Sequence, residues 1–387
     1  MPIPREPAFD VAEYRRRLER VHESMASRSL DALVLFSPHN VFYLSGMDTE
    51  NLSDYQCLLV PAGGDPILVT SHFEEARAAN SCWHRGQVFY GPFEDPLRVT
   101  LDAVRRLKVR TLGLERRNRA VSPDHYRRLA GELSDLRIED PFGVVERSRL
   151  VKSPAEIACM RRAAILTDLG VEAAYAAMRE GQRDSDVAAA IMEAMYGNGS
   201  DTVCWGPIVA AGYRAGSAHS TFMGLPLRRG QTVFLELTAQ VRRYVAPLMR
   251  TAVLGPPSDD MKRVEAAGRA ALACIREEAR PGVEAAHVAR TALAILEPVL
   301  PGHVFHYNFG YPVGIGYPPS WIEEVDFLMR TDNPRPLEAG MTFHLPMSVR
   351  KYGEYGVNLS QTILVGEDET EALARTPARL QQVRFGS

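Results

Sequence analysis

The sequence predicts two domains, an α/β domain over residues 1–145 and an α+β domain over residues 146–387. The length of 387 residues favours more than one hydrophobic core, because domains are commonly roughly 150 residues long. In the first domain, short apolar runs alternate with amphipathic helical patterns. In the second, long helical patterns rich in Ala, Met and Glu are followed by strand-like runs that end in turn-like sequences.

The N-terminal pattern opens with a charged amphipathic helix over residues 11–27, followed by a strand in LDALVLF that ends at the turn-like SPHN. The stretch QCLLVPAGGDPILVT predicts a hairpin across Gly63 and Gly64. Helical FEEARAAN comes next, then strands in VRTLGLE and LRIED on either side of helical PDHYRRLAGEL. This alternation of helix and strand is typical of an α/β domain.

The C-terminal pattern begins at Ser153, because Ser-Pro-Ala-Glu has the spacing of a helix start with a capping glutamate, Glu156. Four helices are expected, over residues 155–178, 184–196, 261–279 and 284–296. Strands are expected in TVFLELTAQV, YVAPLMRTAVLG, MTFHLPMSV and VNLSQTILVG. The mixture indicates an α+β domain.

Bulk composition excludes several classes of partner. With 45 basic and 48 acidic side chains the net charge is −3, which gives no electrostatic case for nucleic acid or an anionic membrane. The N-terminus lacks the apolar core of a signal peptide, so a cytoplasmic protein is expected. The 5 cysteines form no CxxC pair, which argues for buried thiols rather than disulfides or a zinc cluster.

Several ordered segments resemble the pita-bread superfamily of creatinases, prolidases and aminopeptidase P. They are RLVKSPAEIACMRRAA, GPIVAAGYRAGSAHS, GQTVFLEL, YVAPLMRT and LEAGMTFHLPM, with GVNLSQTILVG near the end. DALVLFSPHNVFYLSGMD is similar to the N-terminal domain of the same enzymes. The resemblance implies a pita-bread catalytic domain, and a homodimer in which the N-terminal domain, at the loop over residues 47–55, lies near the partner's active site.

Metal-dependent members of the superfamily hold two divalent ions with two Asp, one His and two Glu. By the resemblance, these positions fall here on Glu236, Pro247, Val313, Pro346 and Ser360. One carboxylate does not hold a dinuclear centre. We therefore expect no metal and no other cofactor.

Two residues are the candidate catalytic groups. His219, in AGSAHST, falls on the superfamily's substrate histidine, and imidazole suits a proton shuttle because its unperturbed pKa lies near neutrality. Glu236 lies in the apolar strand FLEL, where an unpaired carboxylate would be costly to bury. The alternatives are an ordinary loop histidine and a structural salt bridge between Glu236 and an arginine such as Arg250.

Further residues are candidates for binding a small-molecule substrate. In MTFHLPM, side chains alternate between faces, so His344 shares a face with Pro346 and is expected to line the cavity. The same alternation places Asn358 beside Ser360. Aromatic residues of YPPSW could stack on a cationic group. The remaining candidates are Tyr244, Arg250, Tyr311, Trp321 and Glu323.

Four local features make the chain more similar to ectoine hydrolases than to creatinase: FLEL, APLMRT, GYPVGIGYPPSWIEE and GMTFHLP. The resemblance implies metal-independent hydrolysis of a non-peptide C–N bond in a small cyclic amidine or zwitterionic compound. Three alternatives stay open. They are a creatinase-like amidinohydrolase or lyase, a metallopeptidase of the Xaa-Pro type, and an inactive binding scaffold.

Overall fold

The computed structural model describes residues 3–383. The chain divides into two compact units between Arg149 and Leu150. The sequence had placed the boundary between residues 145 and 146. Helix α6, Glu146–Leu150, contains the observed boundary between the two units. Each unit is described separately below.

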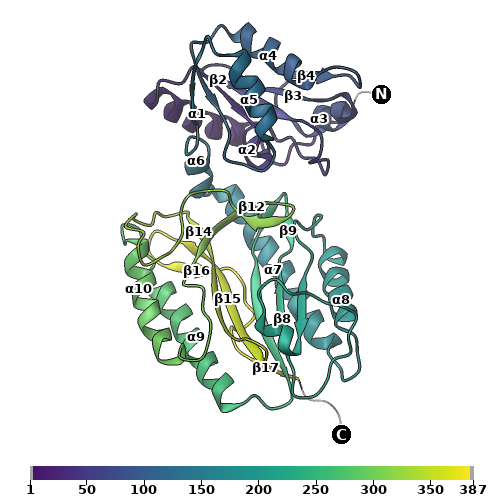
Figure 1. The fold of residues 1–387 in the computed structure, drawn as a ribbon, viewed down its shortest axis with the longest axis vertical. Helices are drawn as coiled ribbons and strands as arrows, with labels where there is room; N and C mark the ends of the chain where they lie inside the picture. The colour runs from purple at the N-terminus through teal and green to yellow at the C-terminus, as the bar shows by residue number, and fades with distance from the viewer. Residues whose placement is uncertain (1–2, 384–387) are drawn as a thin grey trace. The chain divides into compact units, whose positions relative to one another are not determined.

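The first unit is built on a six-stranded sheet of order β4-β3-β2-β1-β5-β6 (Figure 1). Its strands are β1 Ala32–Leu35, β2 Cys57–Pro61, β3 Ile67–Ser71, β4 Gln87–Tyr90, β5 Thr111–Leu114 and β6 Arg137–Glu139. Its helices are α1 Val11–Ser27, α2 Pro38–Ser45, α3 Glu75–Ser81, α4 Pro96–Leu107 and α5 Pro123–Glu132, with a 3-10 turn at His72–Glu74. Strand β1 pairs parallel with β5 and antiparallel with β2, so the sheet is mixed.

Most elements predicted for the first unit are confirmed. Helix α1 has the predicted bounds, and β2 and β3 form the predicted antiparallel hairpin. Strand β4 and helices α2 and α4 were not predicted; α2 begins at Pro38, inside the SPHN stretch that was expected to be a turn. Helix α4 nevertheless carries clear start signals, because the side chain of Asp95 accepts a hydrogen bond from the Leu97 amide and Pro96 occupies the first helical turn.

The second unit contains two helix pairs and two larger sheets. The helices are α7 Pro154–Ala177, α8 Asp184–Gly197, α9 Asp259–Glu278 and α10 Ala285–Leu296, with 3-10 turns at Gly212–Gly216 and Glu297–Val299. The first strands are β7 Ile208–Ala211, β8 Thr232–Leu237, β9 Gln240–Val241, β10 Tyr244–Val245 and β11 Leu248–Leu254. The later strands are β12 Tyr311–Tyr317, β13 Ser320–Ile322, β14 Thr342–Lys351, β15 Tyr355–Val365, β16 Thr370–Ala372 and β17 Gln381–Val383.

Helix α7 begins as the sequence predicted. The Ser153 side chain accepts a hydrogen bond from the Glu156 amide, and the Glu156 carboxylate accepts one from the Ser153 amide, which completes a capping box. The other three predicted helices are confirmed to within two residues at each end.

The two sheets of the second unit have the orders β16-β15-β14-β12-β10-β9 and β17-β11-β8-β7. One apolar core joins α7 and α8 to the four-stranded sheet, and another joins α9 and α10 to β14 and β15. Figure 1 shows the pair α9 and α10 on one side of the strands and α8 on the other. Hydrogen bonds join β11 to β15, including Met249 N–H to Ser360 Oγ at 2.6 Å and Asn358 N–H to Thr251 Oγ1 at 2.8 Å. The strands are therefore covered by helices on the outside, and their inner faces can form a site.

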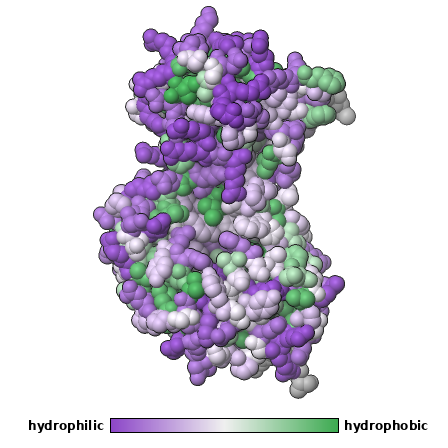
Figure 2. All heavy atoms as spheres, viewed as in Figure 1, coloured by the Kyte–Doolittle hydropathy of each residue, from purple (hydrophilic) through white to green (hydrophobic). Residues whose placement is uncertain are grey.

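The surface carries mixed hydropathy. On the face shown in Figure 2, hydrophilic side chains surround separate, smaller hydrophobic areas. Within the described part of the chain, no helix is long and apolar enough to cross a membrane.

Candidate active site

A cavity of about 340 Å³ opens in the second unit where β8, β11, β12, β13 and β14 meet three connecting segments. Its lining residues are Trp205, Ala218, His219, Glu236, Met249, Phe305, His306, Asn308, Tyr311, Trp321, Ile322, Pro346, Ser348 and Arg350. Four predicted site residues are thus brought together, namely His219, Glu236, Tyr311 and Trp321. A cavity of this size, mostly apolar with a few polar groups, suits a small-molecule ligand.

Glu236 lies in the wall of the cavity and is only 3% exposed. Within residues 3–383, no hydrogen bond or ion pair engages its carboxylate. Burial raises the pKa of Glu236 to about 8, and the positive charge of Arg350 opposes that rise only in part. A buried carboxyl group without donors, beside a cavity, is available for proton transfer or nucleophilic attack.

Arg250 does not neutralise Glu236. Strands β8 and β11 pair Glu236 with Met249, so Arg250 projects from the opposite face of the sheet. Its guanidinium donates to the carbonyls of Met249 and Ser360, each at 2.7 Å, and to the carbonyl of Thr376. Arg250 is fully buried and does not line the cavity, so the structure supports neither the alternative salt bridge with Glu236 nor the predicted contact of Arg250 with substrate.

His219 lies in the loop between the 3-10 turn Gly212–Gly216 and β8, and its side chain lines the cavity. Its backbone has φ 58°, which is unusual for a residue that is not glycine. The ring centroid lies 5.8 Å from that of Trp205, which in turn lies 5.1 Å from Trp321. The imidazole therefore forms one end of a row of three aromatic rings.

His344 lies behind the cavity wall. Its Nδ1 shares a hydrogen bond of 2.6 Å with the Tyr311 hydroxyl, and its Nε2 shares one of 2.6 Å with Ser360 Oγ. Burial lowers the pKa of His344 to about 3, so the ring is neutral. Trp321 Nε1 donates to the same Tyr311 hydroxyl at 3.0 Å. His344 therefore does not line the cavity as predicted. It orients the Tyr311 side chain, which does line the cavity.

Three further predicted residues have structural partners and do not line the cavity. Tyr244 donates to the Glu156 carboxylate at 2.5 Å. Glu323 forms a buried ion pair with Lys152, with an N to O distance of 3.2 Å. Asn358 accepts a hydrogen bond from Ser348, a lining residue, and so supports the wall from behind.

The sequence reasoning missed several lining residues. Ser348 and Arg350 lie on the same face of β14 as Pro346, and the alternation applied to His344 could have been continued to them. His306 and Asn308 come from an irregular segment before β12 and carried no periodic signal. Trp205 lies in a similar segment before β7.

The donor set does not fit a dinuclear metal centre. Within residues 3–383, no group of three or more His, Cys, Asp or Glu side chains could hold a metal ion. Around Glu236, the positions assigned to ligands carry Pro346 and Ser360, and Ser360 is already bonded to His344. Val313 does not line the cavity, whereas Tyr311, two residues earlier, does.

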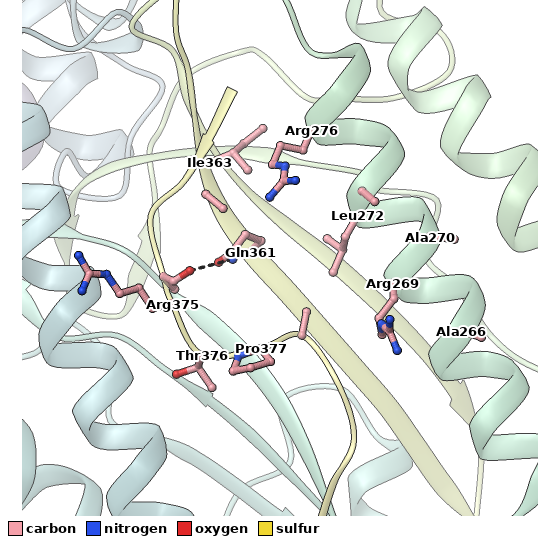
Figure 3. Close-up of a pocket in the computed structure, with 14 residues that line it drawn as sticks. Ala266, Arg269, Ala270, Leu272, Arg276, Gln361, Ile363, Arg375, Thr376 and Pro377 are labelled. Atoms are coloured by element: carbon pink, nitrogen blue, oxygen red, sulfur yellow. Dashed lines mark hydrogen bonds between the residues drawn. The ribbon is translucent and has the colours of Figure 1, made fainter. Parts of the chain in front are cut away.

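A second, larger hollow of about 680 Å³ lies between α9 and the segment over residues 372–378, above β15 (Figure 3). Alanine side chains and the arginines Arg269, Arg276 and Arg375 line it. Gln361 Nε2 donates to the Ala374 carbonyl at 3.1 Å across one side. None of the predicted site residues lies there, so the smaller cavity is the candidate active site.

Comparisons with known proteins agree with this architecture. The model of metallopeptidase family M24 matches residues 158–367, and that of the creatinase/prolidase N-terminal domain matches residues 17–151. The solved prolidase of Thermococcus sibiricus superposes with a TM-score of 0.85 at 19% identity, covering 95% of this chain and 99% of that one. For the dipeptidase PepE of Mycobacterium ulcerans, the TM-score is 0.82 at 24% identity, with 97% and 99% covered.

The fold and the site together define a two-domain enzyme scaffold of the pita-bread type, as the sequence predicted. The chain belongs to metallopeptidase family M24. Among similar proteins, the ectoine hydrolase of Halomonas elongata is 29% identical over 96% of this chain and 98% of its own length. A Xaa-Pro dipeptidase of Pyrococcus horikoshii is 23% identical over 94% of this chain and 98% of its own length.

Proposed function

We propose that this protein hydrolyses a non-peptide C–N bond in a small cyclic amidine or zwitterionic compound. Its similarity to the ectoine hydrolase of Halomonas elongata supports the proposal. One observation carries the proposal. The carboxyl group of Glu236, which accepts no hydrogen bond from the residues that the structure describes, faces a small aromatic cavity that also contains the imidazole of His219. That pair can supply a nucleophile or base and a proton carrier.

The reaction assigns one role to each group. The Glu236 carboxylate attacks the amidine carbon, or removes a proton from the water that attacks it. The C–N bond then breaks, and His219 transfers a proton to the departing nitrogen. If Glu236 is the nucleophile, a second step with water releases the covalent intermediate and restores the carboxylate.

Metal independence is part of the proposal and rests on the donor set. Metallohydrolases use a metal to generate hydroxide and to polarise the scissile group. The cavity offers one carboxyl group, the cationic Arg350 and no second acidic side chain, whereas a dinuclear centre needs several anionic ligands.

A second candidate is a Xaa-Pro dipeptidase, which the similarity to the Pyrococcus horikoshii enzyme favours. That reaction in a family of metallopeptidases would require a metal held by ligands other than those of the cavity described here. The two candidates therefore differ in their metal requirement and in their substrate.

Turnover of ectoine, 5-hydroxyectoine, creatine and a proline dipeptide by chelator-treated protein, with products identified by mass spectrometry, tests the proposal. We expect ring opening of an ectoine with uptake of water and no loss of rate after chelation. A product with an alkene and no added water would indicate a lyase instead. Turnover of the dipeptide alone, restored by metal, would replace the proposal with the peptidase. If none of the four compounds is turned over, with or without added metal, a binding scaffold would be favoured over an enzyme.

A further inference from the structure

Arg350 is a buried cation that faces the candidate active site. Its side chain lines the cavity although the residue is only 4% exposed. Within residues 3–383, no hydrogen bond or ion pair engages its guanidinium group, and Nε is both buried and without a partner. Burying a charge without a counter-ion is costly, so the free protein leaves this group in need of an anion.

The backbone holds Arg350 firmly. It lies near the end of β14, and its N–H and C=O exchange hydrogen bonds with Val304 at 3.0 and 2.7 Å. Its guanidinium carbon lies 5.8 Å from the centre of the Phe234 ring, two residues before Glu236 on β8. The paired backbone, the burial of the side chain and the contact with Phe234 together hold the charge at the cavity wall.

Glu236 does not supply the missing anion. The two residues line the same cavity, but they form no ion pair in the described structure. Since the pKa of Glu236 is raised to about 8, the carboxyl group is largely protonated near neutral pH. Burial lowers the pKa of His306, and the nearby Arg350 and His219 lower it further, so these three basic groups lie close enough to interact. The cavity is therefore electropositive when empty.

We propose that Arg350 binds a carboxylate of the substrate and so restricts this active site to small carboxylic acids. A guanidinium group matches a carboxylate with two parallel N–H donors, which neutral amides do not reproduce. The rest of the ligand lies against the rings of Trp205, Trp321 and Phe305. Bound in this way, the substrate is anchored at one end of the cavity and presents its C–N bond to Glu236.

The inference deepens the proposed function and rests on it for the identity of the cavity as a catalytic site. Binding of a carboxylate does not require turnover, however, so it is measured in a Glu236→Gln background. In that background, residue 236 carries no charge with which Arg350 could interact. A change in affinity on replacing Arg350 therefore reports its contact with the ligand.

Isothermal titration calorimetry of E236Q and E236Q/R350Q with matched acids and amides provides the test. The pairs are ectoine and its carboxamide, proline and prolinamide, and benzoate and benzamide. We expect at least one acid to bind E236Q about 10- to 100-fold more tightly than its amide, the range expected for hydrogen bonds to a charged group. The double variant should lose that preference, with amide affinity unchanged. E236Q/R276Q is the matched control, because Arg276 is exposed and lines the other hollow, not this cavity.

Two results would overturn the inference. One is an acid preference that survives in E236Q/R350Q, and the other is the absence of acid-dependent binding in every pair. The proposed function can fail separately. If acids bind through Arg350 but wild-type protein cleaves no C–N bond, the carboxylate-binding site is supported and the proposed hydrolase function is wrong.

Discussion

The two units each bury a glutamate with a raised pKa, but the two side chains have different surroundings. In the first unit, Glu115 accepts hydrogen bonds from the backbone N–H groups of Phe36 and Ser37 and from Asn40 Nδ2. Burial and the nearby carboxylate of Glu146 raise its pKa to about 7. In the second unit, burial raises the pKa of Glu236 to about 8, and no donor among residues 3–383 bonds to its carboxylate.

The comparison shows that a raised pKa alone does not identify a catalytic group. Glu115 uses its oxygens to hold the start of α2 against β5, and its side chain is fully satisfied. Glu236 leaves its oxygens free at the edge of a cavity, where a substrate can take the place of the missing donors. The number of donors, rather than burial, separates a structural carboxylate from a candidate catalytic one.

The largest expected effect follows from Glu236→Gln. We expect kcat to fall on the order of a thousandfold with ectoine, or with whichever cyclic amidine the protein turns over, because the amide is neither nucleophile nor base. Steady-state kinetics with product detection measures this, and circular dichroism checks that the variant is folded. Full turnover by E236Q would show that Glu236 is not catalytic. The proposed difference in role between Glu236 and Glu115 would then be wrong.

A smaller effect is expected on stability, and here the substitution of Glu115 should cost more than the substitution of Glu236. Glu115→Leu strands three N–H donors inside the first unit and should lower its free energy of unfolding by roughly 3 kcal/mol. Glu236→Leu strands none and should leave the stability of the second unit unchanged or raised. Urea titrations of both variants, followed by far-UV circular dichroism, compare them. Equal losses in the two variants would show that Glu236 has partners of its own.

The smallest effect concerns pH. The pKa of Glu236 is raised from 4.5 to about 8, so its carboxylate fraction increases about tenfold for each pH unit below that value. We therefore expect kcat/KM to rise with pH from about 6, to reach half its maximum near pH 8 and to level about one unit higher. The other titratable groups that face it are Tyr311 on β12, Arg350 on β14, and His219 and His306 on loops.

Two variants sharpen the pH profile. Replacing Arg350 with Gln removes the positive charge that lowers the pKa of Glu236, so the midpoint should move to higher pH. Replacing Glu115 with Gln should leave the midpoint where it is. A profile that is flat or falling between about pH 6 and 8 would contradict a carboxylate role for Glu236.

Local sequence patterns predicted much of the fold. The capping box at Ser153 and the helical periodicity of α7 to α10 are properties of neighbouring residues, and the structure confirms them. Glu236 was recognisable because a charged residue inside an apolar strand demands an explanation. These features depend on short-range interactions, which the sequence displays directly.

Pairing between distant strands decided the rest. Alternation correctly grouped Pro346 with its neighbours on β14, but only the cross-strand pair of Glu236 and Met249 shows that Arg250 faces away. His344 lies behind the cavity because Tyr311 and Ser360, from two other strands, occupy both of its ring nitrogens. By itself, the sequence determined which residues share a face of each strand. Which face meets the cavity, and which charges remain unpaired there, depends on register between segments far apart in the chain, and only the tertiary structure sets it.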